Sequence, residues 1–236
     1  MPRTVASLVL EPAAGLLRQS YAPRRQKRGL FNADGWGVGF YAPGIAEPVR
    51  WRSTRPLWGD ASFASVAAAL TSGAVLAAVR SASAGMPIDE RATAPFSDGR
   101  WLLSHNGQVD RAALPADSAA ESVCDSALLA AHVFHRGPEQ VVDTVRAVAE
   151  RDPGANLNLL LTDGSQIIAL TWGDPLSYLL EPDGIVVASE PWDDDPRWVD
   201  VPDRHVLRVG PAGLTVTPLE NGWPSPTLLS ISTLVT

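Results

Sequence analysis

Residues 156–219 constrain the fold most strongly, because three apolar stretches in this part of the chain are each interrupted by a short turn sequence. The stretches are NLNLLLTDGSQIIALTWG, LSYLLEPDGIVVASE and HVLRVGPAGLTVTPL. Asp-Gly and Pro-Ala-Gly are typical of the tight connections between neighbouring antiparallel strands. The sequence therefore predicts three antiparallel hairpins here.

The first eighty residues are expected to mix short helices with strands. Apolar spacing favours one or two short helices over residues 4–20, and NADGWGVGFYAPG followed by PVRWRST indicates a hairpin. Residues 60–73 have an N-cap candidate in Asp60, helical apolar spacing and a closing glycine, which predicts a helix. A buried strand, AVLAAV, then ends at Arg80.

Helices are expected in the middle of the chain. After the strand RWLLSHNG, residues 117–152 predict two helices divided at Gly137-Pro138. Strands, helices and further strands follow one another without regular alternation, which disfavours a doubly wound parallel fold and favours an α+β layered sandwich. We expect one domain over residues 1–220, with a C-terminal tail over 221–236 that wraps or frays.

Composition narrows the classes of partner. The net charge of −7 argues against binding to nucleic acid or to an anionic membrane, both of which require a basic surface. No apolar run approaches the length of a membrane span and no signal peptide is evident, so the cytoplasm is the expected location. A single cysteine, Cys124, excludes an internal disulfide and a thiolate metal cluster. These features predict a small-molecule ligand.

The stretch LLSHNGQVD, residues 102–110, allows two interpretations. Asn-Gly is common in tight turns, so Asn106 and Gly107 are compatible with a simple hairpin connection. A strand that ends on these residues would instead direct an amide side chain and a bare backbone N–H beyond the sheet. Preorganised donors of this kind form an oxyanion hole, which stabilises the negative oxygen that develops during acyl transfer.

Two charged residues occupy positions where burial is unfavourable without a partner. Arg80 closes an apolar strand and needs a carboxylate or open water. Asp125 lies in an amphipathic helix, flanked by apolar residues that would turn it toward the core. If both lie near the donors at Asn106 and Gly107, they would hold an amino acid by its α-carboxylate and its α-ammonium group, with the donors over a side-chain amide.

Several motifs resemble known families in order and spacing. NADGWGVGF, AAVRSAS, SHNGQVD and CDSALLA resemble the class II glutamine amidotransferase domain, an N-terminal-nucleophile hydrolase. PLWGDASFASV, RSASAGMPIDE and VVASEPWDDDP are similar to the ergothioneine-pathway amidohydrolases, which remove γ-glutamate from γ-glutamyl-hercynylcysteine S-oxide. The resemblance covers almost the whole chain. It implies a four-layer αββα sandwich with mostly antiparallel sheets, a γ-glutamyl substrate and no cofactor or metal.

The same resemblance assigns roles to individual residues. It places Arg80 on the α-carboxylate of the γ-glutamyl group, Asp125 on its α-amino group, and Asn106 with the Gly107 N–H in the oxyanion hole. Further positions match the substrate pocket or the turn beside the nucleophile: Ser81, Ser83, His105, Asp34, Gly35 and Trp36. For Asp34 and the glycines of the turn, a purely structural role is the alternative.

The nucleophile that the resemblance implies is a cysteine at the chain start, whose own α-amino group acts as the base. The present sequence begins MPRTVASLVL, with Pro2 after the methionine. Cys124 does not fit the role, because it lies in a predicted helix without an adjacent base. We therefore expect the first strand, beginning Met-Cys-Arg, to lie upstream of Met1, and no amidohydrolase activity from the chain as written.

Other candidates have simpler explanations. His132 and His135 are spaced for a metal, but no third ligand is evident. The acidic run 193–195 lacks the glycine of a calcium loop and is expected near the pocket rim. A basic cluster could hold an anionic leaving group: Arg24, Arg25, Lys27 and Arg28. Three tryptophans could face a trimethylammonium group but more simply serve packing: Trp36, Trp172 and Trp192.

Three alternative functions remain open from the sequence. The chain could be a glutaminase that supplies ammonia to a partner synthetase, or a catalytically dead domain that binds γ-glutamyl compounds. A weaker alternative uses Pro2 as an N-terminal base. The leaving group and the oligomeric state are not determined by the sequence.

Overall fold

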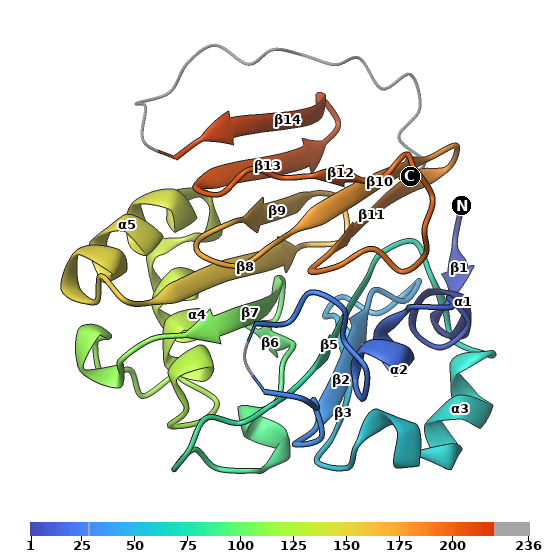
Figure 1. The fold of residues 1–236 in the computed structure, drawn as a ribbon, viewed down its shortest axis with the longest axis horizontal. Coiled ribbons are helices and arrows are strands. Elements are labelled where there is room, and N and C mark those ends of the chain that lie inside the picture. Colours follow the sequence, from blue (N-terminus) through green and yellow to red (C-terminus); the bar gives the residue numbers. More distant parts are fainter. Residues whose placement is uncertain (28, 220–236) are drawn as a thin grey trace.

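The computed structural model describes residues 1–27 and 29–219, and its largest sheet has six strands in the order β14-β13-β9-β8-β7-β6 (Figure 1). Every pairing in it is antiparallel. The strands are β6 (Phe96–Ser97), β7 (Leu102–Gln108), β8 (Asn156–Thr162), β9 (Ile167–Leu170), β13 (His205–Gly210) and β14 (Gly213–Pro218). The predicted hairpins β8–β9 and β13–β14 are confirmed within this sheet.

Two three-stranded sheets make up most of the remaining β-structure. One has the order β3-β2-β5, from β2 (Trp36–Phe40), β3 (Val49–Ser53) and β5 (Val75–Val79). The other has the order β11-β10-β12, from β10 (Ser177–Glu181), β11 (Gly184–Ala188) and β12 (Val199–Asp200). Both contain the antiparallel hairpin that the sequence predicts, β2–β3 and β10–β11.

Helices lie on both sides of the strands (Figure 1). On one side, α4 (Asp125–Arg136) and α5 (Val141–Arg151) pack their apolar faces onto the six-stranded sheet. On the other side, α1 (Val5–Val9), α2 (Leu16–Gln19) and α3 (Ala61–Ala67) cover the β3-β2-β5 sheet. A third apolar cluster joins the six-stranded sheet to β10 and β11. The layers thus follow the predicted order αββα.

The helix expected over residues 60–73 is shorter than predicted. It begins as expected, because the Asp60 side chain accepts a hydrogen bond from the Phe63 N–H at 3.2 Å, but α3 ends at Ala67. Residues beyond it form β4 (Thr71–Ser72), which pairs with β1 (Arg3–Thr4). Strand pairing with the start of the chain therefore replaces the last helical turn. The C-terminal tail expected over 221–236 lies outside the described residues.

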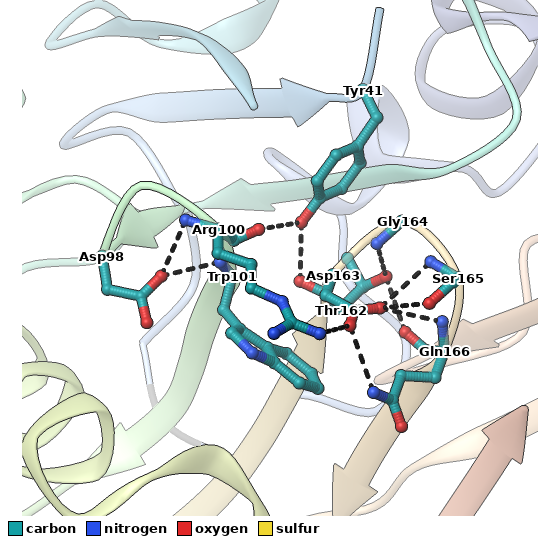
Figure 2. A network of polar contacts seen from close by, with 9 residues as sticks. All are labelled: Tyr41, Asp98, Arg100, Trp101, Thr162, Asp163, Gly164, Ser165 and Gln166. Atoms are coloured by element: carbon teal, nitrogen blue, oxygen red, sulfur yellow. Dashed lines mark hydrogen bonds and ion pairs between the residues drawn. The ribbon is translucent and has the colours of Figure 1, made fainter. Parts of the chain in front are cut away.

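A polar network fixes the turn after β8 (Figure 2). The Tyr41 hydroxyl donates to the Thr162 carbonyl at 2.7 Å, and burial raises the pKa of this tyrosine. Burial also disfavours the charged form of Asp163, but hydrogen bonds from Gln166, Ser165 and Arg100 outweigh it and lower the pKa of this carboxyl. The network joins the end of β2 to the turn between β8 and β9 of the large sheet.

None of the helices in the described ranges is long and apolar enough to cross a membrane.

The centre of the six-stranded sheet is expected to dominate stability. Leu159 on β8 is 1% exposed, so Leu159→Ala removes buried methyl groups and leaves a cavity that should lower the free energy of unfolding by about 2–5 kcal/mol. The matched control, Leu180→Ala on β10, removes a side chain that is 40% exposed and should cost less than about 1 kcal/mol. Urea denaturation measures both, and equal losses would contradict this account of the core.

Candidate active site

A cavity of about 1490 Å³ lies between β5, β7 and β11. Seven of the ten predicted site residues line it: Arg80, Ser81, Ser83, His105, Asn106, Gly107 and Asp125. These residues come from β7, from the start of α4 and from the segment that follows β5. The fold therefore brings together side chains that are up to 45 positions apart in the chain, from Arg80 to Asp125.

Arg80 is held by its backbone, and one nitrogen of its guanidinium has no hydrogen-bond partner among the described residues. Its N–H donates to the Gly35 carbonyl at 2.8 Å, and its carbonyl accepts from the Asp34 N–H at 2.9 Å. The Arg80 Nη1 atom is buried and has no hydrogen-bond partner among the described residues. A buried charged donor without a partner is costly. Its position in the cavity wall suits it to a carboxylate supplied by a ligand.

Asp125 is the first residue of α4 and is 6% exposed. Its Oδ2 atom accepts a hydrogen bond from the Val109 N–H at 3.2 Å, which orients the carboxylate against the strand segment after β7. A carboxylate is stabilised at this position, because the N-terminus of a helix carries a partial positive charge. The cavity thus has a buried carboxylate as well as a guanidinium whose Nη1 atom is buried.

The register of β7 determines where its backbone donors point. Gly107 lies opposite Leu157 on β8, and the Leu157 N–H donates away from β7, to the Trp172 carbonyl. Opposed residues of an antiparallel ladder direct their N–H groups either both toward each other or both away. The Gly107 N–H therefore points away from β8. No described strand occupies that edge of β7 beyond Leu103, where pairing with β6 ends.

The turn interpretation of Asn106 and Gly107 is wrong, because β7 continues through both residues to Gln108. Tertiary pairing with β8 along seven residue pairs overrides the local turn preference of Asn-Gly. The Asn106 side chain is exposed, lines the cavity and makes no hydrogen bond within the described structure. The strand therefore presents an amide side chain and a backbone N–H side by side.

The His105 side chain connects β7 to β8 and to α4 through its two ring nitrogens. Its Nε2 lies 2.9 Å from the Asn156 carbonyl, which can only accept, so this nitrogen carries the proton and Nδ1 accepts from the Ser126 hydroxyl at 2.9 Å in the neutral ring. A Cβ atom on Gly107 would lie 2.0 Å from the same carbonyl. Glycine is therefore required for this close approach of β7 to β8.

The remaining three predicted site residues lie outside the cavity lining. Asp34 accepts a hydrogen bond from the Ala82 N–H at 2.8 Å, which holds the segment after β5. Gly35 has φ +127°, and a Cβ there would lie 2.8 Å from Thr93 Oγ1. Trp36 is 1% exposed and packs on Phe63 with a ring separation of 4.0 Å. In this structure all three support the site through the backbone and the core.

The other sequence candidates do not form a second site. Arg24 pairs with Asp194 at 2.7 Å and Arg25 pairs with Asp200 at 2.6 Å. The guanidinium groups that could have held an anionic leaving group are therefore already paired with acidic side chains. Arg28 lies outside the described residues. Within residues 1–27 and 29–219, no group of three or more His, Cys, Asp or Glu side chains could hold a metal ion.

The tryptophans do not converge on one ligand. Trp36 belongs to the core of the β3-β2-β5 layer, while the Trp172 ring is covered by Arg204 at 3.5 Å. Trp192 lines the cavity, but its ring packs against Trp198 with 6.0 Å between centroids. In the acidic run beside it, Asp193 accepts from the Trp198 indole at 2.7 Å. Asp195 pairs with Arg197 at 2.6 Å, whereas Asp194 pairs with Arg24.

Cys124 is buried and unsuited to attack a substrate. Its side chain is 1% exposed, and its thiol donates weakly to the Ala92 carbonyl at 3.8 Å. Burial raises the pKa of the Cys124 thiol; the charge of Asp125 raises it further and that of Arg80 lowers it. Asp125 and Arg80 therefore both lie close enough to influence this one sulfur atom.

The sequence analysis missed Asn158, a cavity residue in the middle of β8 that is 3% exposed. Its Oδ1 atom accepts from the Trp172 N–H at 2.7 Å, and its Nδ2 atom donates to the Asp174 carbonyl at 2.8 Å. A polar residue inside the apolar run NLNLLL is the signal that could have identified it.

Comparison with known proteins agrees with this architecture. A family model described as glutamine amidotransferases class-II matches residues 17–183, and the chain belongs to that family. Its fold is accordingly the four-layer sandwich of the N-terminal-nucleophile hydrolases. The gamma-glutamyl-hercynylcysteine sulfoxide hydrolase of Mycolicibacterium smegmatis is 62% identical over 219 residues, which cover 92% of this chain and 96% of that protein. A relative of the same name from Mycobacterium tuberculosis H37Rv is 62% identical over 216 residues, covering 92% of each chain.

Two solved structures resemble the fold at lower identity. A glutamine aminotransferase class-II domain protein from Silicibacter pomeroyi has a TM-score of 0.63 and 22% identity, covering 80% of this chain and 92% of its own. The glutamine phosphoribosylpyrophosphate amidotransferase of Bacillus subtilis has a TM-score of 0.60 and 15% identity, covering 80% and 44%. At these identities the likeness shows the fold.

Because Cys124 is buried, we expect its thiol to resist labelling in the native protein. Reaction with a disulfide reagent at pH 8 should be on the order of a hundredfold slower than after unfolding in urea, since labelling requires local opening. Absorbance of the released thiolate measures the rate. Immediate labelling of the native protein would show that Cys124 is accessible and would contradict its exclusion as a nucleophile.

Proposed function

We propose that this protein is a γ-glutamyl amidohydrolase that cleaves γ-glutamyl-hercynylcysteine S-oxide in ergothioneine biosynthesis. The observation that carries the proposal is 62% identity over 92% of the chain to hydrolases named for this substrate. The cavity supports it with a guanidinium, a carboxylate and two amide donors from predicted site residues. The small-molecule substrate in the names of the relatives supports a cytoplasmic reaction, which is part of this proposal.

The proposed binding mode uses both charged groups of the glutamyl moiety. Arg80 takes the α-carboxylate, which supplies the partner that its buried Nη1 atom lacks within the described chain. Asp125 takes the α-ammonium group at the start of α4. Held at these two points, the glutamyl side chain would extend with its γ-carbonyl toward Asn106 and Gly107, and Ser81 and Ser83 would line the same pocket.

The proposed reaction is acyl transfer through a thioester. A cysteine thiolate attacks the γ-carbonyl carbon, and the oxyanion that forms is stabilised by the Asn106 amide and the Gly107 N–H. The C–N bond then breaks, the amine leaves with a proton from the nucleophile's α-ammonium group, and a glutamyl thioester remains. Water hydrolyses the thioester to release glutamate and regenerate the thiol.

The proposed location of this cysteine is a strand that fills the gap between β5 and β11. Within the described residues, β5 pairs with β2 alone and β11 with β10 alone, so each has one unpaired edge. All residues of both strands line the same cavity. The apolar run of β5 was expected to be buried, yet four of its five residues are half-exposed, as are Ile185–Ala188 of β11. Continuous apolar strands are typical of buried positions in a sheet.

The ends of the two strands set the direction of the missing one. Both begin near the start of the chain, because Arg3 pairs with Ser72 just before β5 and the Met1 amine contacts the Asp183 carbonyl just before β11. Both end on the side of Arg80 and Glu190. A strand antiparallel to both would therefore start beside Arg80 and run toward Met1. These strand edges, rather than the position of Met1, support an upstream cysteine strand.

The first test is glutamate release by a protein that carries this cysteine strand. Arg80→Ala should raise KM by roughly 10- to 100-fold, because a charge-assisted hydrogen bond to the substrate is lost. Asn106→Ala should instead lower kcat by about 10²- to 10³-fold, the scale found when one oxyanion donor is removed. No glutamate release by the unsubstituted protein would refute the proposal, and a pure KM effect of Asn106→Ala would refute the oxyanion assignment.

The second test is the nucleotide sequence upstream of the Met1 codon. We expect an in-frame start followed by a cysteine codon, separated from Met1 by about one strand of five to six residues and a short loop. A stop codon in frame immediately before Met1 would contradict the upstream strand. We expect expression from the upstream start to confer glutamate release, measured with the 236-residue chain as the control.

A further inference from the structure

A basic segment, residues 23–27, lines the cavity and is hydrogen-bonded to residues near the C-terminal end of the chain. We call it the strap. Its residues Pro23, Arg25, Gln26 and Lys27 line the cavity together with Arg80 and Asn106. The strap follows α2, yet the hydrogen bonds of Arg24, Arg25 and Lys27 go to residues beyond 170. The hydrogen-bonding roles of its backbone were not evident from the sequence.

The centre of these contacts is Glu190, which is 3% exposed and lines the cavity just after β11. Both of its carboxylate oxygens accept from the Arg24 N–H, at 3.0 and 2.9 Å, and one accepts from the Arg25 N–H at 2.6 Å. Two successive backbone N–H groups directed at one buried carboxylate are held by charge-assisted hydrogen bonds, which are stronger than neutral ones.

Side-chain contacts reinforce the same junction. Arg25 bonds to Asp200 at 2.6 Å and to Ser177 Oγ at 3.1 Å, and Lys27 donates to the Gly173 carbonyl at 2.7 Å. These partners lie in or beside the β11-β10-β12 sheet. The side chains of Arg24, Arg25 and Lys27 are exposed, so their ion pairs are screened by solvent and are weaker than the buried contacts of Glu190.

The strap lies at the end of the cavity where the proposed substrate binds. Glu190 follows the end of β11, and Gly29, farther along the chain, lies close enough to Ser81 that an added Cβ would be 3.5 Å from its hydroxyl. Ser81 directly follows Arg80 at the end of β5. Gln26 and Gly29 thus lie close to the end of β5, where Ser81 follows Arg80.

We infer that Glu190 is a positioning residue that latches the strap over the γ-glutamyl pocket and thereby retains the substrate. Glu190 does not contact the reacting atoms in this account. It acts through the backbone of Arg24 and Arg25, which closes one wall of the pocket. The effect on substrate rests on the proposed function, whereas the latch itself is a property of the chain alone.

The latch can be tested on the 236-residue chain by limited digestion with trypsin, which cuts after arginine and lysine. Glu190→Gln replaces one carboxylate oxygen, which accepts a hydrogen bond, with an amide NH₂ group, which can only donate. At least one hydrogen bond from the Arg24 or Arg25 N–H is therefore lost. Cleavage after Arg24 and Arg25 should become roughly tenfold faster or more, because it requires local opening of the strap. The control Glu150→Gln, exposed on α5, should be cut at the unsubstituted rate.

Each variant is digested at the same interval below its own melting temperature, and the cleavage sites are identified by mass spectrometry. No increase at these two bonds, or an equal increase along the whole chain, would overturn the latch. If Glu190→Gln does not fold, Glu190→Asp decides the question, because it keeps the carboxylate but shortens the side chain by one methylene and so withdraws it from the Arg24 and Arg25 N–H groups. Faster cutting of the strap in that variant supports the latch, and an unchanged rate overturns it.

The substrate role is tested in the protein that carries the cysteine strand, with γ-glutamyl-hercynylcysteine S-oxide as substrate. Glu190→Gln should raise KM about tenfold and leave kcat within about twofold, since the chemical groups are untouched. Glu190→Asp, which keeps the carboxylate, should recover part of the loss. A fall in kcat at constant KM would overturn the positioning role. Inactivity of the unsubstituted protein would instead refute the proposed function and leave the trypsin result intact.

Discussion

The antiparallel ladder between β7 and β8 fixes the direction of every donor that this strand offers to the cavity. Asn106 pairs with Asn158 and Gly107 with Leu157, so a shift of one residue would turn the Gly107 N–H into the ladder and move its neighbours to the opposite face. The close approach of Gly107 to the Asn156 carbonyl and the two hydrogen bonds of His105 hold this register. The site is therefore built on a strand of the six-stranded sheet and is more rigid than a loop would be.

The charged groups depend on the same framework. Arg80 is placed by backbone bonds to Asp34 and Gly35, and Asp125 by the start of α4 and the Val109 N–H. A buried Nη1 atom without a hydrogen-bond partner in the described chain lowers stability, which fits a role of Arg80 in binding. In class II amidotransferases a substrate with one carboxylate and one ammonium group would meet both requirements at once, which agrees with the γ-glutamyl group in the names of the relatives.

Much of this could be predicted from the sequence because the relevant signals are local. Alternating apolar runs with Asp-Gly or Pro-Ala-Gly turns predicted the hairpins β8–β9, β10–β11 and β13–β14, and Gly137-Pro138 predicted the division between α4 and α5. The motif resemblance identified the family and seven residues that line one cavity. The sequence analysis failed where distant pairing decides the local structure. Thr71 and Ser72 form a strand with Arg3 and Thr4 in place of a helical turn. At Asn106-Gly107 the sequence left both a turn and a strand open, and pairing with β8 decided for the strand.

The sequence by itself determined the order of elements, the antiparallel class and the chemical types available to the site, because periodicity and turn residues act over a few positions. Only the tertiary structure decided which way the Gly107 N–H points, that the Arg80 Nη1 atom lacks a partner within the described chain, and that Glu190 accepts hydrogen bonds from the backbone of Arg24 and Arg25. These features arise from register and from contacts between residues as far as 166 positions apart. No local pattern encodes them, since each depends on how separate strands and loops meet in space.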